Sequence, residues 1–127
     1  MTFGNVSVSA DGVNFNLDGA NLGLRKEFND LSFGNFSTIY LRTPPGTAFG
    51  SLNSRINGDF TMGTGVQGIV QGRFIELGGN LTIGDNSEYR FASEIQFEGN
   101  VTLGSSSGTN YVFNTDAEFE GLVTFNG

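Results

Sequence analysis

The sequence is built around a short motif that recurs along its second half. Four copies align on a threonine, at Thr61, Thr82, Thr102 and Thr124, so successive copies lie 21, 20 and 22 residues apart. A nearly constant period of this length is typical of repeat proteins, in which each unit stacks on its neighbours. The repeat predicts an elongated fold whose function lies in assembly rather than in chemistry.

Each repeat unit contains three stretches in which apolar residues alternate with others. In the best-preserved unit these stretches are Tyr89-x-Phe91, Ile95-x-Phe97 and Val101-x-Leu103. Alternation with a period of two places both apolar side chains on one face of a strand. We therefore expect an all-β, repetitive β-helix or β-solenoid with three short strands per unit. Its predicted repeat core consists of Phe60, Leu81, Ile83, Phe91, Phe97, Val101, Leu103, Phe113, Phe119, Val123 and Phe125.

Glycine marks the corner between the second and third stretch. It occurs as Gly58, Gly79, Gly99 and Gly121, and the first three are followed by Asp or Asn. Glycine, Asn and Asp all tolerate the positive φ that tight corners often need, so we expect positive φ at these corners. The aligned threonines predict a ladder on one face, which β-propensity alone explains.

Phenylalanine dominates the apolar composition, with 13 copies and no tryptophan. A single-chain coil with short edges favours compact Ile, Leu and Val, whereas large rings suit three chains that meet on one axis. We therefore predict an intertwined homotrimeric triangular β-prism, with a monomeric solenoid as the alternative.

The chain has neither cysteine nor histidine, which excludes disulfides, thiol nucleophiles, imidazole bases and Cys or His metal sites. Two carboxylate pairs share repeat positions, Glu98 with Glu120 and Glu94 with Asp116. Stacked units would bring each pair to about 5 Å, a separation compatible with a retaining glycosidase. Because Glu98 precedes a corner, where a solubilising acid is expected in any case, we predict no catalytic residue, no metal and no cofactor.

The net charge of −7 is concentrated in the C-terminal part, where eight acids from Glu76 onward face only Arg90. Such a surface repels phosphate and anionic lipid, so we expect no nucleic-acid partner. The N-terminus has no basic segment followed by an apolar run, and no stretch reaches the length of a membrane span. We therefore expect no signal peptide and no membrane insertion.

The first 47 residues carry the motif only in degraded form, and Pro44-Pro45 marks the boundary of the regular repeats. We divide the chain into an attachment segment at 1–47 and a repetitive shaft at 48–127. Leu24, Phe28 and Leu31 have helical spacing and predict a short helix. Further along, Gly65, Gly68 and Gly72 predict a long loop. The candidate attachment residues are Arg25, Lys26, Phe28 and Arg42.

The stretches Gly79–Gly84, Gly99–Gly104 and Gly121–Gly127 resemble the G-N-L-T-V-x-G repeats of bacteriophage virion fibres. The resemblance covers about the last 80 residues. It implies a homotrimeric β-helical shaft whose N-terminal portion docks on the virion, and it carries over no catalytic residue. We therefore expect a virion structural protein on the exterior of the particle, made in the host cytoplasm. Its expected partners are further copies of itself and tail, baseplate or capsid proteins.

Several functions fit that resemblance. A tail fibre that serves host adsorption is favoured, and a capsid decoration protein is the alternative. An alternative of another class is a tailspike-like polysaccharide depolymerase. A host-surface glycan is a further candidate partner, with Tyr89 and Tyr111 as stacking platforms, although both tyrosines fit better as core residues. The final motif copy ends at Gly127 without a polar cap, so we expect further chain or another subunit to cover that end.

Overall fold

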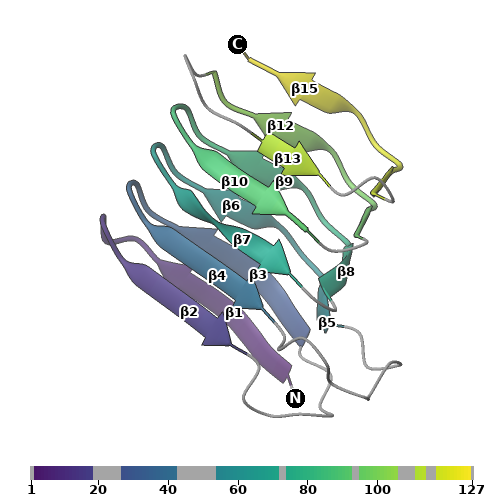
Figure 1. The fold of residues 1–127 in the computed structure, drawn as a ribbon. Coiled ribbons are helices and arrows are strands. Elements are labelled where there is room, and N and C mark those ends of the chain that lie inside the picture. Colours follow the sequence, from purple (N-terminus) through teal and green to yellow (C-terminus); the bar gives the residue numbers. More distant parts are fainter. Residues whose placement is uncertain are drawn as a thin grey trace.

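The computed structural model describes residues 2–18, 27–42, 54–71, 74–92, 95–105, 111–113 and 117–126. These residues form an all-β solenoid of parallel strands, with the N-terminus at one end of the stack and the C-terminus at the other (Figure 1). The strands are β1 (Thr2–Val8), β2 (Asn14–Asp18), β3 (Glu27–Phe33), β4 (Thr38–Arg42), β5 (Ser54–Ile56), β6 (Phe60–Met62), β7 (Gln67–Gln71), β8 (Phe74–Leu77), β9 (Leu81–Ile83), β10 (Glu88–Phe91), β11 (Gln96–Phe97), β12 (Val101–Leu103), β13 (Tyr111–Phe113), β14 (Glu118–Phe119) and β15 (Val123–Phe125). The predicted all-β solenoid is thus confirmed.

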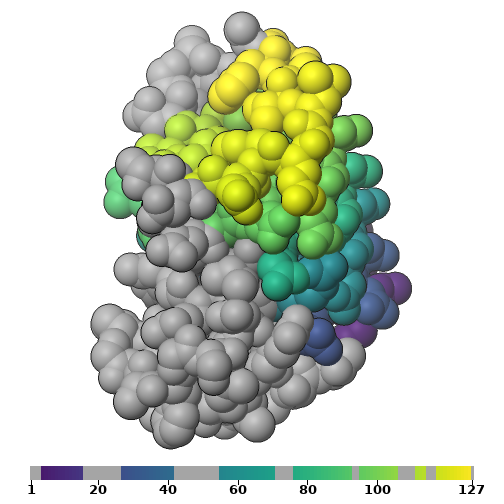
Figure 2. Space-filling model, turned by 90° about the vertical axis from the view of Figure 1, so that its right-hand side faces the viewer, coloured from purple at the N-terminus to yellow at the C-terminus, as the bar shows by residue number. Residues whose placement is uncertain are grey.

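The strands form two parallel sheets that together make three facets. The larger sheet runs β14-β11-β8-β5-β3-β6-β9-β12-β15, with β1 also paired to β3, and the smaller runs β13-β10-β7-β4-β2. Strand β3 is long enough to pair with both β5 and β6, so the larger sheet divides there into two facets. The predicted three strands per repeat unit are therefore confirmed for β5 to β13, and two strands, β14 and β15, follow in the last unit. Figure 2 shows the same stacking as successive colour bands that end in the yellow of the last strands.

The repeats stack in register, as the constant period predicts. Thr61 pairs with Thr82, Thr82 with Thr102, and Thr102 with Thr124. Serines extend this ladder, since Ser7 pairs with Ser32 and Ser32 with Thr61. Strands β1 to β4 of the first segment therefore belong to the same stack as β5 to β15. The assignment of different tasks to the two segments stays a prediction.

The core runs along the inside of the stack as columns of apolar side chains. Phe60, Leu81, Ile83, Phe91, Phe97, Val101 and Leu103 are buried as predicted. In the last turn the predicted core residues Phe119, Val123 and Phe125 are exposed, because the structure places no further turn over them. Phe113 of the preceding turn is half-buried against the core. Since the single chain buries Phe28, Phe60, Phe91 and Phe97 unaided, ring size gives no support for a trimer, which stays a prediction.

The prediction of a short helix is wrong for its described part, because Phe28 and Leu31 lie in β3. Both side chains point into the core, and the residues between them follow a bend of the long strand. Pairing with β1, β5 and β6 overrides the helical spacing. Leu24 lies outside the described residues.

The prediction of a long loop at Gly65, Gly68 and Gly72 is also wrong for the segment from Gln67 to Gln71. Residues Gln67–Gln71 form β7, which pairs with β4 on one side and β10 on the other. Gly68 lies inside that strand with φ 153° and stacks between Ile39 and Tyr89. This glycine serves close packing rather than flexibility.

The corner glycines occur where predicted, but the predicted positive φ is wrong. None of Gly58, Gly79, Gly99 and Gly121 is among the described residues with positive φ. A Cβ on Gly79 would collide with the carbonyl of Gly58, and the same holds for Gly99 against Gly79 and Gly121 against Gly99. Close approach of successive turns therefore requires glycine here. Positive φ occurs instead at the other corner, at Gly12, Phe36, Gly65 and Asn86.

Asn and Asp side chains connect the turns next to these glycines. Each accepts a hydrogen bond from the backbone N–H of its counterpart in the next turn: Asp59 N to Asp30 Oδ1 (2.8 Å), Asn80 N to Asp59 Oδ1 (2.8 Å), Asn100 N to Asn80 Oδ1 (2.9 Å) and Leu122 N to Asn100 Oδ1 (3.1 Å). We call this set the Asx ladder. It ends at Leu122, whose side chain has no acceptor and is 70% exposed.

Candidate functional site

The carboxylates that could have formed an enzymatic pair are engaged in contacts with neighbouring turns. Arg55 bonds to Glu76 and, at 3.2 Å, to Glu98. The pKa of Arg55 is raised, first because its side chain donates a hydrogen bond to Glu98 and then by the attraction of the two carboxylates, against the opposing effect of burial. Glu120 accepts a hydrogen bond of 2.7 Å from Gln96 Nε2. Glu98 and Glu120 are thus tied to different partners, which fits a structural role.

The second predicted pair, Glu94 and Asp116, lies outside the described residues. Within the described ranges, no group of three or more acidic side chains could hold a metal ion. The same part of the chain contains no helix that could cross a membrane.

The candidate attachment residues are only partly placed. Arg25 and Lys26 lie outside the described residues. Arg42 ends β4, where its backbone pairs with Asp18 and Gln71. Phe28 is 1% exposed and packs in the core, so it is corrected from an attachment residue to a core residue.

Tyr89 is a core residue, as the preferred interpretation predicted, and is not available as a stacking platform. Its ring is buried, and its hydroxyl donates a hydrogen bond of 3.2 Å to the Ile39 carbonyl. The ring reaches Ile39 across Gly68, where an added Cβ would lie 2.9 Å from Tyr89 Cε2. Burial raises the pKa of the phenol, which therefore stays protonated and uncharged.

Tyr111 is half-buried, and its hydroxyl is directed at the Gly104 carbonyl at 3.2 Å. Burial raises its pKa, the charge of Asp85 raises it further, and the hydrogen bond at Gly104 opposes the shift. Tyr89 therefore presents no free ring face, whereas the ring of Tyr111 is partly exposed.

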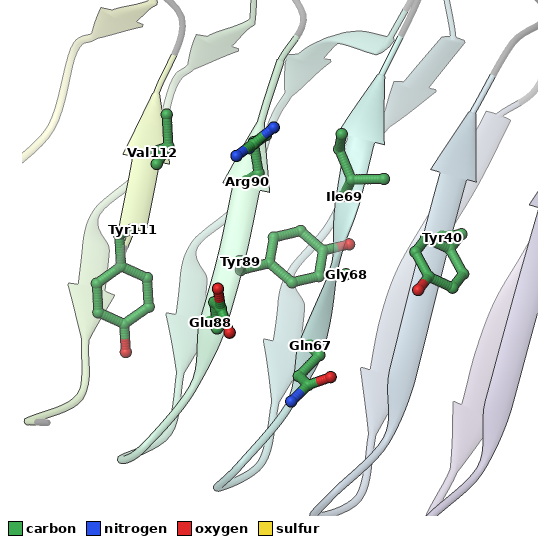
Figure 3. A pocket seen from close by; sticks show the side chains of 9 residues that line it. All are labelled: Tyr40, Gln67, Gly68, Ile69, Glu88, Tyr89, Arg90, Tyr111 and Val112. Carbon is green, nitrogen blue, oxygen red and sulfur yellow. The ribbon is translucent and has the colours of Figure 1, made fainter. Parts of the chain in front are cut away.

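A different tyrosine, Tyr40, borders a depression on the surface of the described part of the molecule. This depression, which we call the sheet hollow, has a volume of about 480 Å³ and lies on the smaller sheet (Figure 3). It is lined by Tyr40 of β4; Gln67, Gly68 and Ile69 of β7; Glu88, Tyr89 and Arg90 of β10; and Tyr111 and Val112 of β13. Its volume lies within the ~300–1,000 Å³ typical of small-ligand sites.

The register explains how these side chains come together. Tyr40, Ile69, Arg90 and Val112 are direct neighbours on four adjacent strands, and Gln67 pairs with Glu88 two residues earlier. Side chains alternate along a strand, so these two rows face outward while Ile39, Tyr89 and Phe91 face the core. The sequence did not predict Tyr40, Gln67 or Glu88 as site residues. Two features of the sequence could have indicated them. Each alternates with core residues, which predicts an outward-facing side chain, and Arg90 is the only cation from Glu76 onward.

The sheet hollow combines apolar surface with the polar side chains of Gln67, Glu88 and Arg90. No hydrogen bond or ion pair ties the side chains of Glu88 and Arg90 to the described ranges, and both residues are exposed. A guanidinium donates hydrogen bonds, a carboxylate accepts them, and an amide such as that of Gln67 does both. The arrangement suits binding of a small polar molecule rather than bond cleavage.

Comparison with known proteins identifies no family for this chain. No protein-family model matches the chain, and neither a curated protein nor a solved structure matches it significantly.

Proposed function

We propose that the chain is a structural subunit of a bacteriophage virion fibre, with a tail fibre as the favoured location. The observation that carries this proposal is the in-register stacking of equal turns along a single axis. A stack of this kind produces length without a catalytic cleft, which is what a shaft requires. The sequence resemblance to virion-fibre repeats supports the same conclusion.

The contacts between turns fit a shaft better than a polysaccharide depolymerase. Arg55 spans three turns by bonding to Glu76 and Glu98, and the Asx ladder adds a hydrogen bond at each corner. These polar groups therefore stabilise the stacking of turns. A glycosidase needs a carboxylate pair free to act on the glycosidic bond, and in the described residues both members of the pair Glu98 and Glu120 are engaged with other side chains.

Electron microscopy of purified virions, labelled with an antibody against this chain, tests the proposal. Labels on appendages outside the capsid are expected. Labels spread evenly over the shell would instead identify a capsid decoration protein. Particles that lack the chain altogether would contradict a virion role of either kind.

A further inference from the structure

The sheet hollow has the dimensions of a site for a small, elongated molecule. Neighbouring strands lie about 4.8 Å apart, so Tyr40 and Arg90, separated by β7, stand roughly 10 Å from each other along the row. The row of Gln67 and Glu88 runs parallel to it, two residues earlier on the same face. A ligand of one or two sugar rings fits along such a trough.

The lining is chemically suited to a saccharide. Tyr40, Ile69 and Val112 provide apolar surface, against which the C–H face of a sugar ring can pack. Gln67, Glu88 and Arg90 provide donors and acceptors close together, and hydroxyl groups both donate and accept. A purely apolar ligand would leave these groups without partners, at a cost in desolvation.

The charges favour a neutral ligand. The hollow contains one carboxylate, Glu88, and one guanidinium, Arg90, which balance each other. The chain as a whole carries −7, which disfavours approach of an anion. Elsewhere on the surface Arg55 is neutralised by Glu76 and Glu98, whereas Arg90 has no such partner in the described part of the chain.

We propose that the sheet hollow binds a neutral saccharide, with Tyr40 against the ring face and Gln67, Glu88 and Arg90 bonded to hydroxyl groups. This role does not depend on the virion assignment, because the site belongs to the chain itself. It also differs from the predicted glycan contact, since Tyr89 and Tyr111 are replaced by Tyr40 as the aromatic surface.

Nuclear magnetic resonance titration of the full ¹⁵N-labelled chain tests the proposal. The probes are D-glucose, D-galactose, D-mannose and N-acetyl-D-glucosamine, with D-glucuronic acid as the charged counterpart of glucose. At least one neutral sugar is expected to cause saturable shifts at residues 40, 67–69, 88–90 and 112. The proposal is overturned if no neutral sugar does so, or if only glucuronic acid binds.

Variants then assign the contacts. Arg90→Gln and Glu88→Gln remove charges without breaking an intramolecular bond in the described structure, so both chains are expected to fold normally. Each should weaken binding of the best neutral sugar about tenfold, the effect of losing one well-placed hydrogen bond to a charged group. Glu118→Gln, an exposed position on β14 in the larger sheet, is the matched control and should leave binding unchanged. Unaltered affinity in both hollow variants would contradict the assignment.

Discussion

Phe36 shows at the scale of a single residue how the solenoid corners constrain sequence. Gly12, Phe36, Gly65 and Asn86 occupy corners between the larger and the smaller sheet, and all have φ between 56° and 71°. Glycine adopts this conformation freely and Asn tolerates it, whereas Phe adopts it at a cost. The ring of Phe36 is 65% exposed, so burial of the side chain offers little compensation.

Replacing Phe36 should therefore separate the cost of the backbone conformation from the contribution of the ring. Phe36→Gly and Phe36→Ala both remove the ring, but only glycine relieves the unfavourable φ. We expect the glycine variant to have a free energy of unfolding about 1 kcal/mol greater than the alanine variant. Urea denaturation of the two proteins measures the difference. Equal stability would show that φ at residue 36 relaxes without cost.

Tyr89 should make stability sensitive to alkaline pH. Its pKa is raised by burial, whereas the phenol of the unfolded chain ionises near its usual pKa of about 10. The stability that depends on the neutral phenol is therefore complete below about pH 10 and decreases as the pH rises further. The free energy of unfolding falls with rising pH because only the unfolded state loses the phenol proton in this range.

We expect the free energy of unfolding to fall more steeply between about pH 9 and 11 for the natural chain than for Tyr89→Phe. At neutral pH the variant should be less stable by about 1 kcal/mol, since it lacks the hydrogen bond to the Ile39 carbonyl. Denaturation midpoints across this range measure both effects. Parallel pH profiles would contradict a buried, protonated Tyr89.

Aromatic rings pack against one another across successive turns of strands. The ring centroid of Phe97 in β11 lies 5.4 Å from that of Phe91, 5.7 Å from that of Phe113 and 4.9 Å from that of Phe119. The Phe119 ring is parallel to it, within 4°. Phe97 thus joins three consecutive turns through one side chain.

Phe97→Ala should cost about 3–5 kcal/mol in the free energy of unfolding, because it leaves a cavity where the rings of three turns meet. Thr102→Ala, on the outward face of the adjacent β12, is the control and should change stability by no more than about 0.5 kcal/mol. Thermal and urea unfolding followed by circular dichroism measure both. Similar losses in the two variants would argue against a shared aromatic core.

The elements that could be predicted from sequence are those whose signal is local. The triplet from Val101 to Leu103 forms a strand because its two apolar side chains share one buried face. The helical spacing of Phe28 and Leu31 also fits two core positions on either side of a strand bend, so spacing alone could not distinguish a helix from a strand. Gly68 has the sequence context of a loop, but in strand β7 its lack of a side chain accommodates a tyrosine from the next turn.

The sheet hollow could not be predicted, because it depends on register across turns. Tyr40 and Ile69 are 29 residues apart, and Ile69 and Arg90 are 21 apart. The regular period continues only from Thr61 onward, so it could not align Tyr40 with the later turns. Pairing between β4 and β7 supplies that missing alignment.

At the scale of the whole molecule, the first segment covers one end of the regular turns. Strand β3 pairs with β5 and β6, and β4 pairs with β7. Their side chains Phe28, Leu31, Phe33, Ile39 and Leu41 are buried in the common core. Loss of this segment would expose the apolar side of the turn formed by β5, β6 and β7, which β3 and β4 now cover.

Deletion of residues 1–47 should therefore have two effects. We expect the remaining chain to keep a β-rich circular-dichroism spectrum but to unfold at a lower temperature than the full chain, because its first turn loses apolar burial. As an attachment segment, the deleted part should also be required for incorporation into particles. Incorporation of the truncated chain would contradict the attachment role.

The predicted homotrimer is tested separately by light scattering of the full chain. A monomeric mass would contradict that prediction.

The direction of the hydrogen bonds between turns has a mechanical consequence. Because these bonds join strands of successive turns, they lie along the long axis, and tension between the two ends loads them one turn at a time. Each regular turn from Thr61 onward that peels away releases 20–22 residues, or roughly 70 Å of extended chain. Stretching a single molecule should therefore give a regular sawtooth of force against extension, with that spacing between peaks. A fibre made in this way would yield gradually under load, so that a brief pull shortens the ordered stack without destroying it.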